Sequence, residues 1–269
     1  MDVLKVKDLS YSYDKKKILD SISFSIKEKT INAVLSSNNG GKTTLIKTLS
    51  GILPCDSGNI SVNKTKLGKN NYAKYSLNIS TILDDIDEQF ICETVQDEVE
   101  YPLINLKYKP KKIKKITDNV MSLLKIDNIA NIKTDYLRKY EKVRVLLAAS
   151  IVSCPKVLFI DDLLRFLTEK EKEEILDMFK SICSEFGITI LFTTSNLNDL
   201  KDIDNIIVLN DGKIIMEDSF DNIILNDNEL SKIGIEIPMM IDLSRKLQFY
   251  NLLDKIYYDK DEVVDKLWN

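Results

Sequence analysis

The chain has 269 residues, of which 44% are hydrophobic, and its formal net charge is −4. That length and apolar content are enough to bury one large core or two smaller ones. The acidic balance argues against bulk nucleic-acid binding, and no apolar run approaches the ~20 residues of a membrane-spanning helix. The chain has no histidine and no Cys-x-x-Cys pair among its four cysteines, so a zinc site is not expected. Four scattered thiols are typical of a protein in a reducing cytosol.

The first predicted elements are two half-buried antiparallel strands. Apolar residues fall roughly on alternate positions over residues 4–13 and again over 22–26. The continuous apolar run 31–35 predicts a third strand, in a sheet that is covered on both faces. A helix follows whose apolar face lies over 45–49, with Gly51 placed to end it as a left-handed cap.

Between the third strand and that helix lies a predicted phosphate-binding loop. A strand that ends in a Gly-Lys-Thr turn and opens into a helix presents backbone N–H groups and a helix N-terminus to an anion. We expect Lys42 to add a positive charge there and the Thr43 hydroxyl to ligate Mg²⁺. The residues predicted to bind the nucleotide in this loop are Ser36, Ser37, Asn38, Asn39, Gly40, Gly41, Lys42, Thr43 and Thr44.

The loop departs from the usual G-x-x-x-x-G-K-[ST] motif at its first two glycines, where Ser36 and Asn39 stand instead. Asparagine tolerates a left-handed backbone reasonably well, whereas serine adopts it at a cost of roughly 1–2 kcal/mol. We therefore expect binding of a nucleoside triphosphate to be weakened but retained.

The rest of the chain alternates between strands and helices. Short strands are predicted at 60–62 and 79–83, followed by a helical, more charged stretch from about 94 to 153. Three further buried strands are predicted, at 157–160, 188–192 and 206–209. An Asn-Asp-Gly hairpin turn at 210–212 follows the last of them. This order describes an α/β nucleotide-binding core with an inserted helical lobe.

The second element that a P-loop nucleotide site needs is an acidic residue after a buried strand, which holds Mg²⁺. The apolar strand 157–160 supplies it, because it ends in Asp161 and Asp162. With Lys42 and Thr43 upstream, we predict Asp161 as the Mg²⁺-side carboxylate, in a metal site shared with Thr43.

A basic cluster surrounds Pro110. It is either the solvated start of a helix or a surface that contacts anionic lipid headgroups, and the sequence leaves both open. Its members are Lys107, Lys109, Lys111, Lys112, Lys114 and Lys115.

Over its full length the chain resembles the nucleotide-binding domains of ABC transporters. The run Leu9-Ser10-Tyr11-Ser12-Tyr13 resembles the loop whose aromatic ring stacks on adenine, which would give Tyr13 that role; a strand aromatic in the core is the alternative. The segment 88–95 and the tail, over 230–238, 243–247 and 261–268, resemble the energy-coupling-factor (ECF) branch, which takes up vitamins and metal ions.

The resemblance implies a P-loop NTPase (RecA-like) α/β fold with an antiparallel β subdomain, an inserted helical subdomain and a small C-terminal helical extension. It implies an ATP-binding domain over 1–225, with the helical part at about 94–153, and an ECF-type dimerisation extension over 226–269. The implied cofactors are ATP and Mg²⁺. The implied partners are a second ABC ATPase subunit, which would be a paralogue, an integral membrane scaffold subunit and a substrate-binding membrane subunit; nucleic acid is not among them. The chain itself would lie peripherally at the cytoplasmic face of the cell membrane.

The family's signature motif is altered. A Leu-Ser-Gly-Gly-Gln run, which meets the γ-phosphate held by the partner subunit, aligns with residues 137–141, and no glycine lies between 69 and 186. Because a side chain keeps the backbone away from a phosphate, Tyr140 should push the backbone back. Arg138 and Lys139 either present charge in place of the lost donors or merely face solvent.

Further motifs depart from the family pattern. The family's switch histidine falls within the Thr-Thr-Ser-Asn run 193–196, which has no histidine. The Q-loop glutamine of the family aligns with Asp84, and its catalytic glutamate aligns with Asp162. Its D-loop aspartate aligns with Thr168. Asp162, the predicted catalytic residue, is one methylene short, and a ~1 Å misplacement can lower a rate about 100-fold. We therefore expect ATP·Mg²⁺ binding with very slow hydrolysis.

Three functions remain at this point. The leading one is an ATP-binding subunit of an ECF-type ABC transporter with weak intrinsic hydrolysis. The alternative is a nucleotide-gated structural or regulatory subunit that closes on ATP without splitting it, paired with a more active paralogue. A P-loop kinase of small molecules is disfavoured, because the four arginines form no lid-like cluster.

Overall fold

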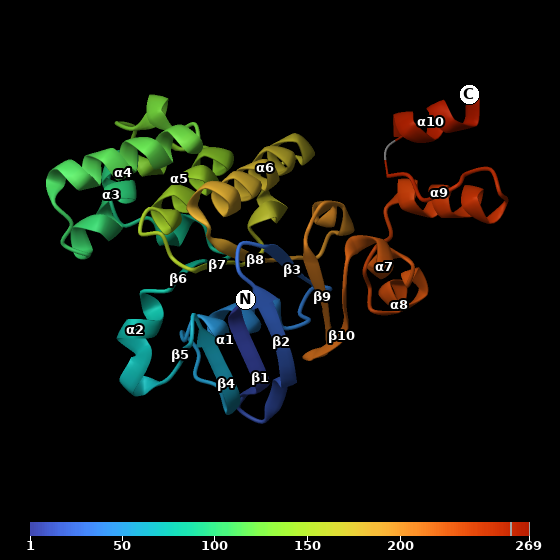
Figure 1. Cartoon of the computed structure of the whole chain (residues 1–269), viewed down its shortest axis with the longest axis horizontal. Helices are drawn as coiled ribbons and strands as arrows, with labels where there is room; N and C mark the ends of the chain where they lie inside the picture. The colour runs from blue at the N-terminus through green and yellow to red at the C-terminus, as the bar shows by residue number, and fades with distance from the viewer. Residues whose placement is uncertain (259, 269) are drawn as a thin grey trace.

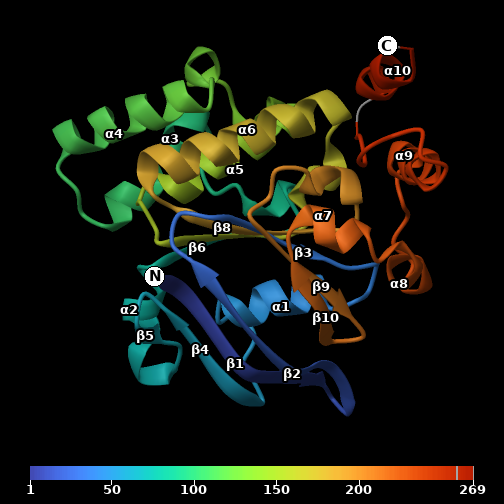
Figure 2. The same ribbon diagram turned by 45° about the vertical axis from the view of Figure 1, so that its right-hand side comes forward.

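The chain folds around two β-sheets, and the computed structural model describes residues 1–258 and 260–268. A six-stranded sheet crosses the middle of the molecule (Figure 1). The helices between residues 95 and 186 cover one of its faces, and a smaller antiparallel sheet with one helix covers the other. Figure 2 shows the same layers after a turn of 45°, with the C-terminal helices at the opposite end from the inserted helices.

The N-terminal sheet is antiparallel and runs in the order β2-β1-β4-β5. Its long hairpin confirms the two strands predicted from alternating apolar residues. The last strand has two residues, too few to show a period in the sequence. The bounds are β1 Asp2–Tyr13, β2 Lys16–Lys27, β4 Ser57–Val62 and β5 Thr65–Lys66.

The six-stranded sheet has the order β10-β9-β3-β8-β7-β6, and its strands are parallel except for β10. Each buried run predicted from the sequence is one of these strands, and the Asn-Asp-Gly turn joins β9 to β10 as expected. The bounds are β3 Ile31–Leu35, β6 Ile79–Ile82, β7 Val157–Ile160, β8 Thr189–Thr194, β9 Asn205–Asn210 and β10 Lys213–Asp218.

The central strands are buried on both faces because their alternate residues enter two different cores. Leu158 and Ile160 of β7 point into the core beneath the helical layer. Val157 and Phe159 of the same strand enter the core shared with the antiparallel sheet. A strand sandwiched in this way needs apolar residues at every position, which is why it reads as a continuous run.

The helices confirm the α/β order predicted from the sequence. One short helix follows the phosphate-binding loop, a second precedes β6, and three more form the inserted helical stretch before a long helix that follows β7. Their bounds are α1 Lys42–Leu49, α2 Tyr72–Ser76, α3 Val95–Asn105, α4 Pro110–Leu123, α5 Lys139–Ile151 and α6 Glu169–Phe186. Among the 3₁₀ turns, Leu163–Phe166 links β7 to α6.

Local capping explains where two of these helices begin and end. Gly51 comes directly after Ser50, the C-cap residue of α1, and has φ of 75°, as its predicted role as a left-handed cap requires. Thr168, at the position of the family's D-loop aspartate, caps α6: its hydroxyl accepts from the N–H of Glu171, whose carboxylate accepts from Thr168 in return. Thr168 therefore has a structural role at this position.

The C-terminal part is helical. Leu253, Tyr257 and Val263 form a small apolar cluster of their own there, separate from the two large cores. No helix in the described parts of the chain is long and apolar enough to cross a membrane. The bounds are α7 Phe220–Ile224, α8 Asp227–Lys232, α9 Met239–Phe249 and α10 Lys260–Trp268.

Candidate functional site

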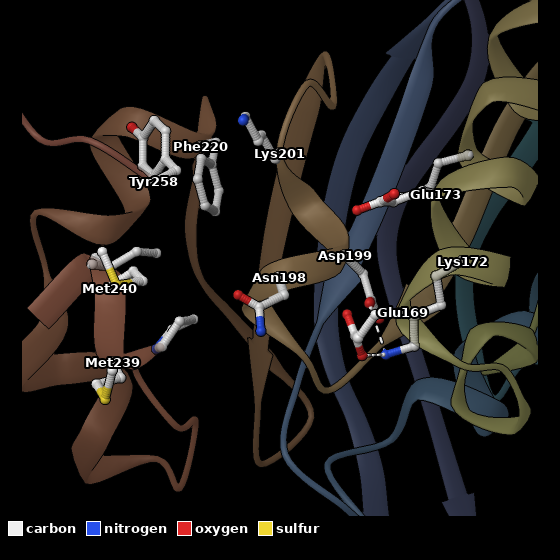
Figure 3. A pocket seen from close by; sticks show the side chains of 13 residues that line it. Glu169, Lys172, Glu173, Asn198, Asp199, Lys201, Phe220, Met239, Met240 and Tyr258 are labelled. Atoms are coloured by element: carbon white, nitrogen blue, oxygen red, sulfur yellow. Dashed lines mark hydrogen bonds and ion pairs between the residues drawn. The ribbon is translucent and has the colours of Figure 1, made fainter. Parts of the chain in front are cut away.

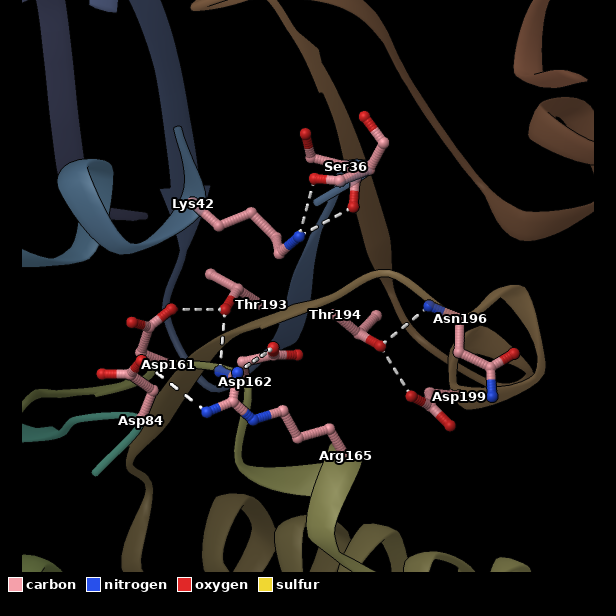
Figure 4. A network of polar contacts seen from close by, with 11 residues as sticks. Ser36, Lys42, Asp84, Asp161, Asp162, Arg165, Thr193, Thr194, Asn196 and Asp199 are labelled. Atoms are coloured by element: carbon pink, nitrogen blue, oxygen red, sulfur yellow. Dashed lines mark hydrogen bonds and ion pairs between the residues drawn. The ribbon is translucent and has the colours of Figure 1, made fainter. Parts of the chain in front are cut away.

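The predicted phosphate-binding loop joins β3 to α1, and Lys42 closes it (Figure 4). The Nζ atom of Lys42 donates to the carbonyl oxygens of Ser36 at 2.8 Å and Ser37 at 2.9 Å. Burial lowers the pKa of Lys42 below its usual value, while the carboxylates of Asp162 and Asp161 oppose that shift. An anion entering the loop would offer this ammonium a stronger acceptor than two neutral carbonyls.

The loop backbone fits a close approach by a ligand. A Cβ atom at Gly40 would lie 1.9 Å from Ser36 Oγ, and Gly41 has φ of 102°, so both positions favour glycine. Asn39 adopts the left-handed conformation expected of it, with φ of 65°. Ser36 does not have a positive φ, so the strain considered for it from the sequence is absent.

Asp161 lies at the carboxyl end of β7 and is completely buried. Its Oδ1 atom accepts from the Thr193 hydroxyl at 2.8 Å, but no described residue gives its Oδ2 atom a hydrogen bond. Burial raises the pKa of Asp161, and the hydroxyls of Thr43 and Thr193 oppose that rise. A buried carboxylate oxygen without a partner costs free energy, and carboxylate and hydroxyl oxygens are ligands that suit Mg²⁺. The donor set therefore fits that ion.

Asp162 and Asp84 face each other across Arg165 (Figure 4). The Nη1 atom of Arg165 lies 3.3 Å from Asp162 Oδ2, and its Nη2 atom lies 3.8 Å from Asp84 Oδ2. The backbone N–H of Asp162 donates to the Thr193 hydroxyl at 2.9 Å. Sequence reasoning did not identify Arg165 as a site residue. Its spacing of three residues after the acidic pair was the available signal.

These groups line one hollow of about 690 Å³. Its wall consists of residues 38–44 except Gly40, together with Lys16, Ile18, Asp84, Asp162 and Arg165. Ser36, Ser37 and Gly40 belong to the loop but not to this wall, and Asp161 is buried. The structure thus brings the predicted loop and the acidic strand end to one place.

Tyr13, predicted to stack on adenine, lies at the end of β1 beside this hollow. It pairs in the sheet with Lys16, which lines the hollow. The residue is 48% exposed, and its ring meets Tyr11 edge to face, with 4.9 Å between ring centroids. The ring is therefore accessible to a ligand rather than enclosed in the core.

The corner after β8, where the family's switch histidine would stand, is fastened to α6. The Thr194 hydroxyl donates to Asp199 Oδ2 at 2.6 Å and accepts from the N–H of Asn196 (Figure 4). Asp199 lies 3.2 Å from the Nζ atom of Lys172 on α6, which also pairs with Glu169 (Figure 3). Because Asp199 and Lys172 are both buried, this corner is held by an ion pair shielded from water.

The altered signature also packs against α6. The Tyr140 hydroxyl donates to Glu174, and the Arg144 guanidinium lies 4.4 Å from the centre of the Tyr140 ring. Lys139, one of the two residues considered as substitutes for the lost phosphate donors, pairs with Asp87 at 2.6 Å. Arg138 is exposed. In the isolated chain, therefore, Lys139 already has a carboxylate partner.

The Tyr140 contact predicts a pH-dependent contribution to stability. Burial, with the hydrogen bond to Glu174, raises the pKa of Tyr140 to about 12, whereas an unfolded tyrosine has a pKa of about 10. The folded state holds the proton more tightly, so this contribution is complete below about pH 10 and is lost as the pH rises toward 12. We expect the free energy of unfolding in urea to fall more steeply for the unchanged chain than for Tyr140→Phe from about pH 9.5 to 11. Tyr136→Phe is the control, because it changes an exposed ring and should give the same pH profile as the unchanged chain. Parallel profiles for Tyr140→Phe and the unchanged chain would contradict the prediction.

Comparison with protein families supports the same fold and site. The model of the ABC transporter family matches residues 19–165. The energy-coupling factor transporter ATP-binding protein EcfA of Pediococcus pentosaceus is 30% identical over 241 residues, which cover 88% of this chain and 86% of that protein. EcfA1 of Mesomycoplasma hyopneumoniae (strain 7448) is 28% identical and covers 99% of this chain and 97% of its own length.

Solved structures agree with this result. The structure of cbiO1 from Clostridium perfringens, described as part of the ABC transporter complex cbiONQ, superposes with a TM-score of 0.79 at 27% identity. The match covers 91% of this chain and 99% of that one. An ABC transporter cassette in its ADP conformation has a TM-score of 0.73 at 21% identity, a likeness that shows the fold alone. The predicted P-loop NTPase fold is confirmed.

Proposed function

This chain belongs to the ABC transporter family, in its branch of energy-coupling-factor ATP-binding subunits, and from that premise we propose that it binds ATP with Mg²⁺ to power uptake of a vitamin or metal ion. Closure of an ATPase dimer would be coupled to membrane partners. One observation carries the proposal: Lys42 and Thr43 lie close to Asp161, whose Oδ2 atom has no hydrogen-bond partner among the described residues, beyond the carboxyl ends of the parallel strands β3 and β7 on either side of β8.

The proposed roles follow from chemistry and placement. The loop 36–44 holds the phosphates, with Lys42 pairing with their charge, and Tyr13 stacks on the adenine ring. Thr43 and Asp161 hold Mg²⁺, which when bound neutralises phosphate charge. Asp162 is the proposed catalytic residue, since it lines the same hollow next to Asp161.

We propose that hydrolysis by this chain's own site is weak. Asp162 has a short side chain that already pairs with Arg165, and the run 193–196, where the family has its switch histidine, contains no histidine. Removing one donor that stabilises transition-state charge commonly lowers turnover by about 10²–10³-fold. These features support a site that binds ATP but hydrolyses it slowly.

The proposed organisation follows the family. Residues 1–225 would form the ATP-binding domain, with the helical part at about 94–153, and residues 226–269 the extension that pairs two subunits. Large exposed apolar side chains on the extension, at Met239, Phe249, Tyr250 and Trp268, support the pairing role. The proposed partners are a paralogous ATPase subunit, an integral membrane scaffold and a substrate-binding membrane subunit, with the chain bound peripherally at the cytoplasmic face.

A turnover measurement tests this proposal. We expect calorimetry to detect association of Mg·ATP with the purified chain, while phosphate release stays at least about 100-fold below the ~1 s⁻¹ at the low end of ordinary enzyme rates. Asp162→Glu, which restores the missing methylene, should raise the rate if side-chain length limits it. Absence of nucleotide binding would refute the function, and rapid phosphate release would refute the weak hydrolysis.

A further inference from the structure

The hollow above the phosphate-binding loop has an acidic end. Asp84 and Asp162 line it, and Asp161 is buried nearby. The negative charges of Asp84 and Asp162 add to the rise in the pKa of Asp161 that burial causes. Of the three cationic side chains that the described part of the chain contributes to the hollow, Lys42 from the loop and Arg165 from the turn after β7 lie near these carboxylates, and Lys16 is the third. Arg165 is close enough to Lys42 for its charge to lower the pKa of that lysine. The two cations therefore act on one small volume.

Arg165 is held in this volume by contacts that leave it available. Its ion pairs with Asp162 and Asp84, at 3.3 and 3.8 Å, are longer than the ~2.7–2.9 Å of a strong charge-assisted hydrogen bond. The guanidinium also lies 4.5 Å from the centre of the Phe166 ring, which supports one of its faces. A guanidinium carries five N–H donors in a planar fork, so it has capacity for a better acceptor.

The terminal phosphate of a nucleoside triphosphate is such an acceptor. Bound with its other phosphates in the loop, it would bring negative charge toward the carboxylate end, where repulsion would oppose it unless a cation lies there. A nucleoside diphosphate brings no such group. Beside the Mg²⁺ proposed at Thr43 and Asp161, Arg165 is the side-chain cation that pairs with Asp84 and Asp162 at that end, and its fork matches phosphate oxygens.

We propose that Arg165 recognises the γ-phosphate: Asp84 and Asp162 hold it in the nucleotide-free chain, and ATP, but not ADP, draws it onto the terminal phosphate and so releases Asp162. This inference rests on the proposed ATP-binding function. It makes Arg165 the residue by which the site distinguishes ATP from ADP and couples that recognition to the availability of the catalytic carboxylate.

The test is calorimetric titration of the full chain with Mg·ADP and with a non-hydrolysable ATP analogue. Arg165→Gln should weaken binding of the analogue by about 10-fold or more, as expected for loss of a hydrogen-bonded charge, while ADP affinity changes by less than about 3-fold. Arg165→Lys keeps the charge but loses the fork, so an intermediate loss is expected. Arg245→Gln, a control on the C-terminal extension where Arg245 pairs with Asp227, should change neither affinity.

A double variant separates recognition of phosphate from simple charge balance. If Arg165 only compensates Asp84, then Asp84→Asn combined with Arg165→Gln should restore binding of the analogue, and the inference is overturned. It is overturned equally if Arg165→Gln leaves the ATP-to-ADP affinity ratio unchanged. If the unchanged chain binds neither nucleotide, the proposed function itself fails. A selective loss that persists in the double variant supports the assignment.

Discussion

Lys42→Ala is expected to bind ATP at least about 100-fold more weakly than the unchanged chain. The ammonium is buried in the phosphate-binding loop, where its present acceptors are the carbonyl oxygens of Ser36 and Ser37. A hydrogen bond to a charged group contributes about 1.5–3 kcal/mol, and each 1.4 kcal/mol is a tenfold change in affinity. Two such bonds to phosphate account for the expected loss.

Calorimetric titration with Mg·ATP measures this effect. Lys47→Ala is the matched control, because Lys47 lies on the same helix α1 but does not line the hollow. Circular dichroism and thermal unfolding of both variants would exclude a general loss of structure. Unchanged ATP affinity in Lys42→Ala would mean that this loop is not the phosphate site.

Asp161→Asn is expected to remove most of the gain in ATP affinity that Mg²⁺ provides. Asparagine keeps an acceptor for the Thr193 hydroxyl, but it has no charge and replaces the unpaired Oδ2 atom with a donor. Loss of groups that merely orient metal ligands lowers metal affinity by about 10–100-fold, so loss of the ligand itself should reduce the Mg²⁺-dependent gain by at least about 10-fold.

Titrations with ATP in Mg²⁺ and in excess chelator measure this gain, with Asp118→Asn, on the exposed side of α4, as the control. Without nucleotide, Asp161→Asn should be no less stable to heat than the unchanged chain, because a buried charge has been removed. An equal fall in stability and affinity, with the Mg²⁺ gain intact, would show instead that Asp161 serves only as a partner of Thr193.

The β3–α1 region illustrates what short-range sequence patterns predict. The apolar run, the Gly-Lys-Thr turn, the helix face and the cap at Gly51 all lie where they were expected. Each of these features depends on backbone conformation or on burial within a few residues, so neighbouring positions carry the information. Ser36 differed, because it lies outside the left-handed region, and its carbonyl oxygen accepts from Lys42 six residues along the chain.

The altered motifs illustrate what such patterns miss. Tyr140 was expected only to keep a backbone away from phosphate, yet its hydroxyl binds Glu174 and ties α5 to α6. Lys139 was considered for a partner's phosphate, yet it pairs with Asp87 in its own chain. Both contacts join residues far apart in sequence, and no local pattern records which side chains will meet.

The sequence by itself determined the strand–loop–helix order, the phosphate-binding loop with Lys42, and an acidic strand end at Asp161, because hydrophobic periodicity and backbone requirements are local. Only the tertiary structure decided what surrounds them. Arg165 meets Asp84 because β6 and β7 pair in parallel, which brings their carboxyl ends to one edge of the sheet. Whether a carboxylate there is free, paired or without a partner depends on that juxtaposition, which arises only when distant strands pack together.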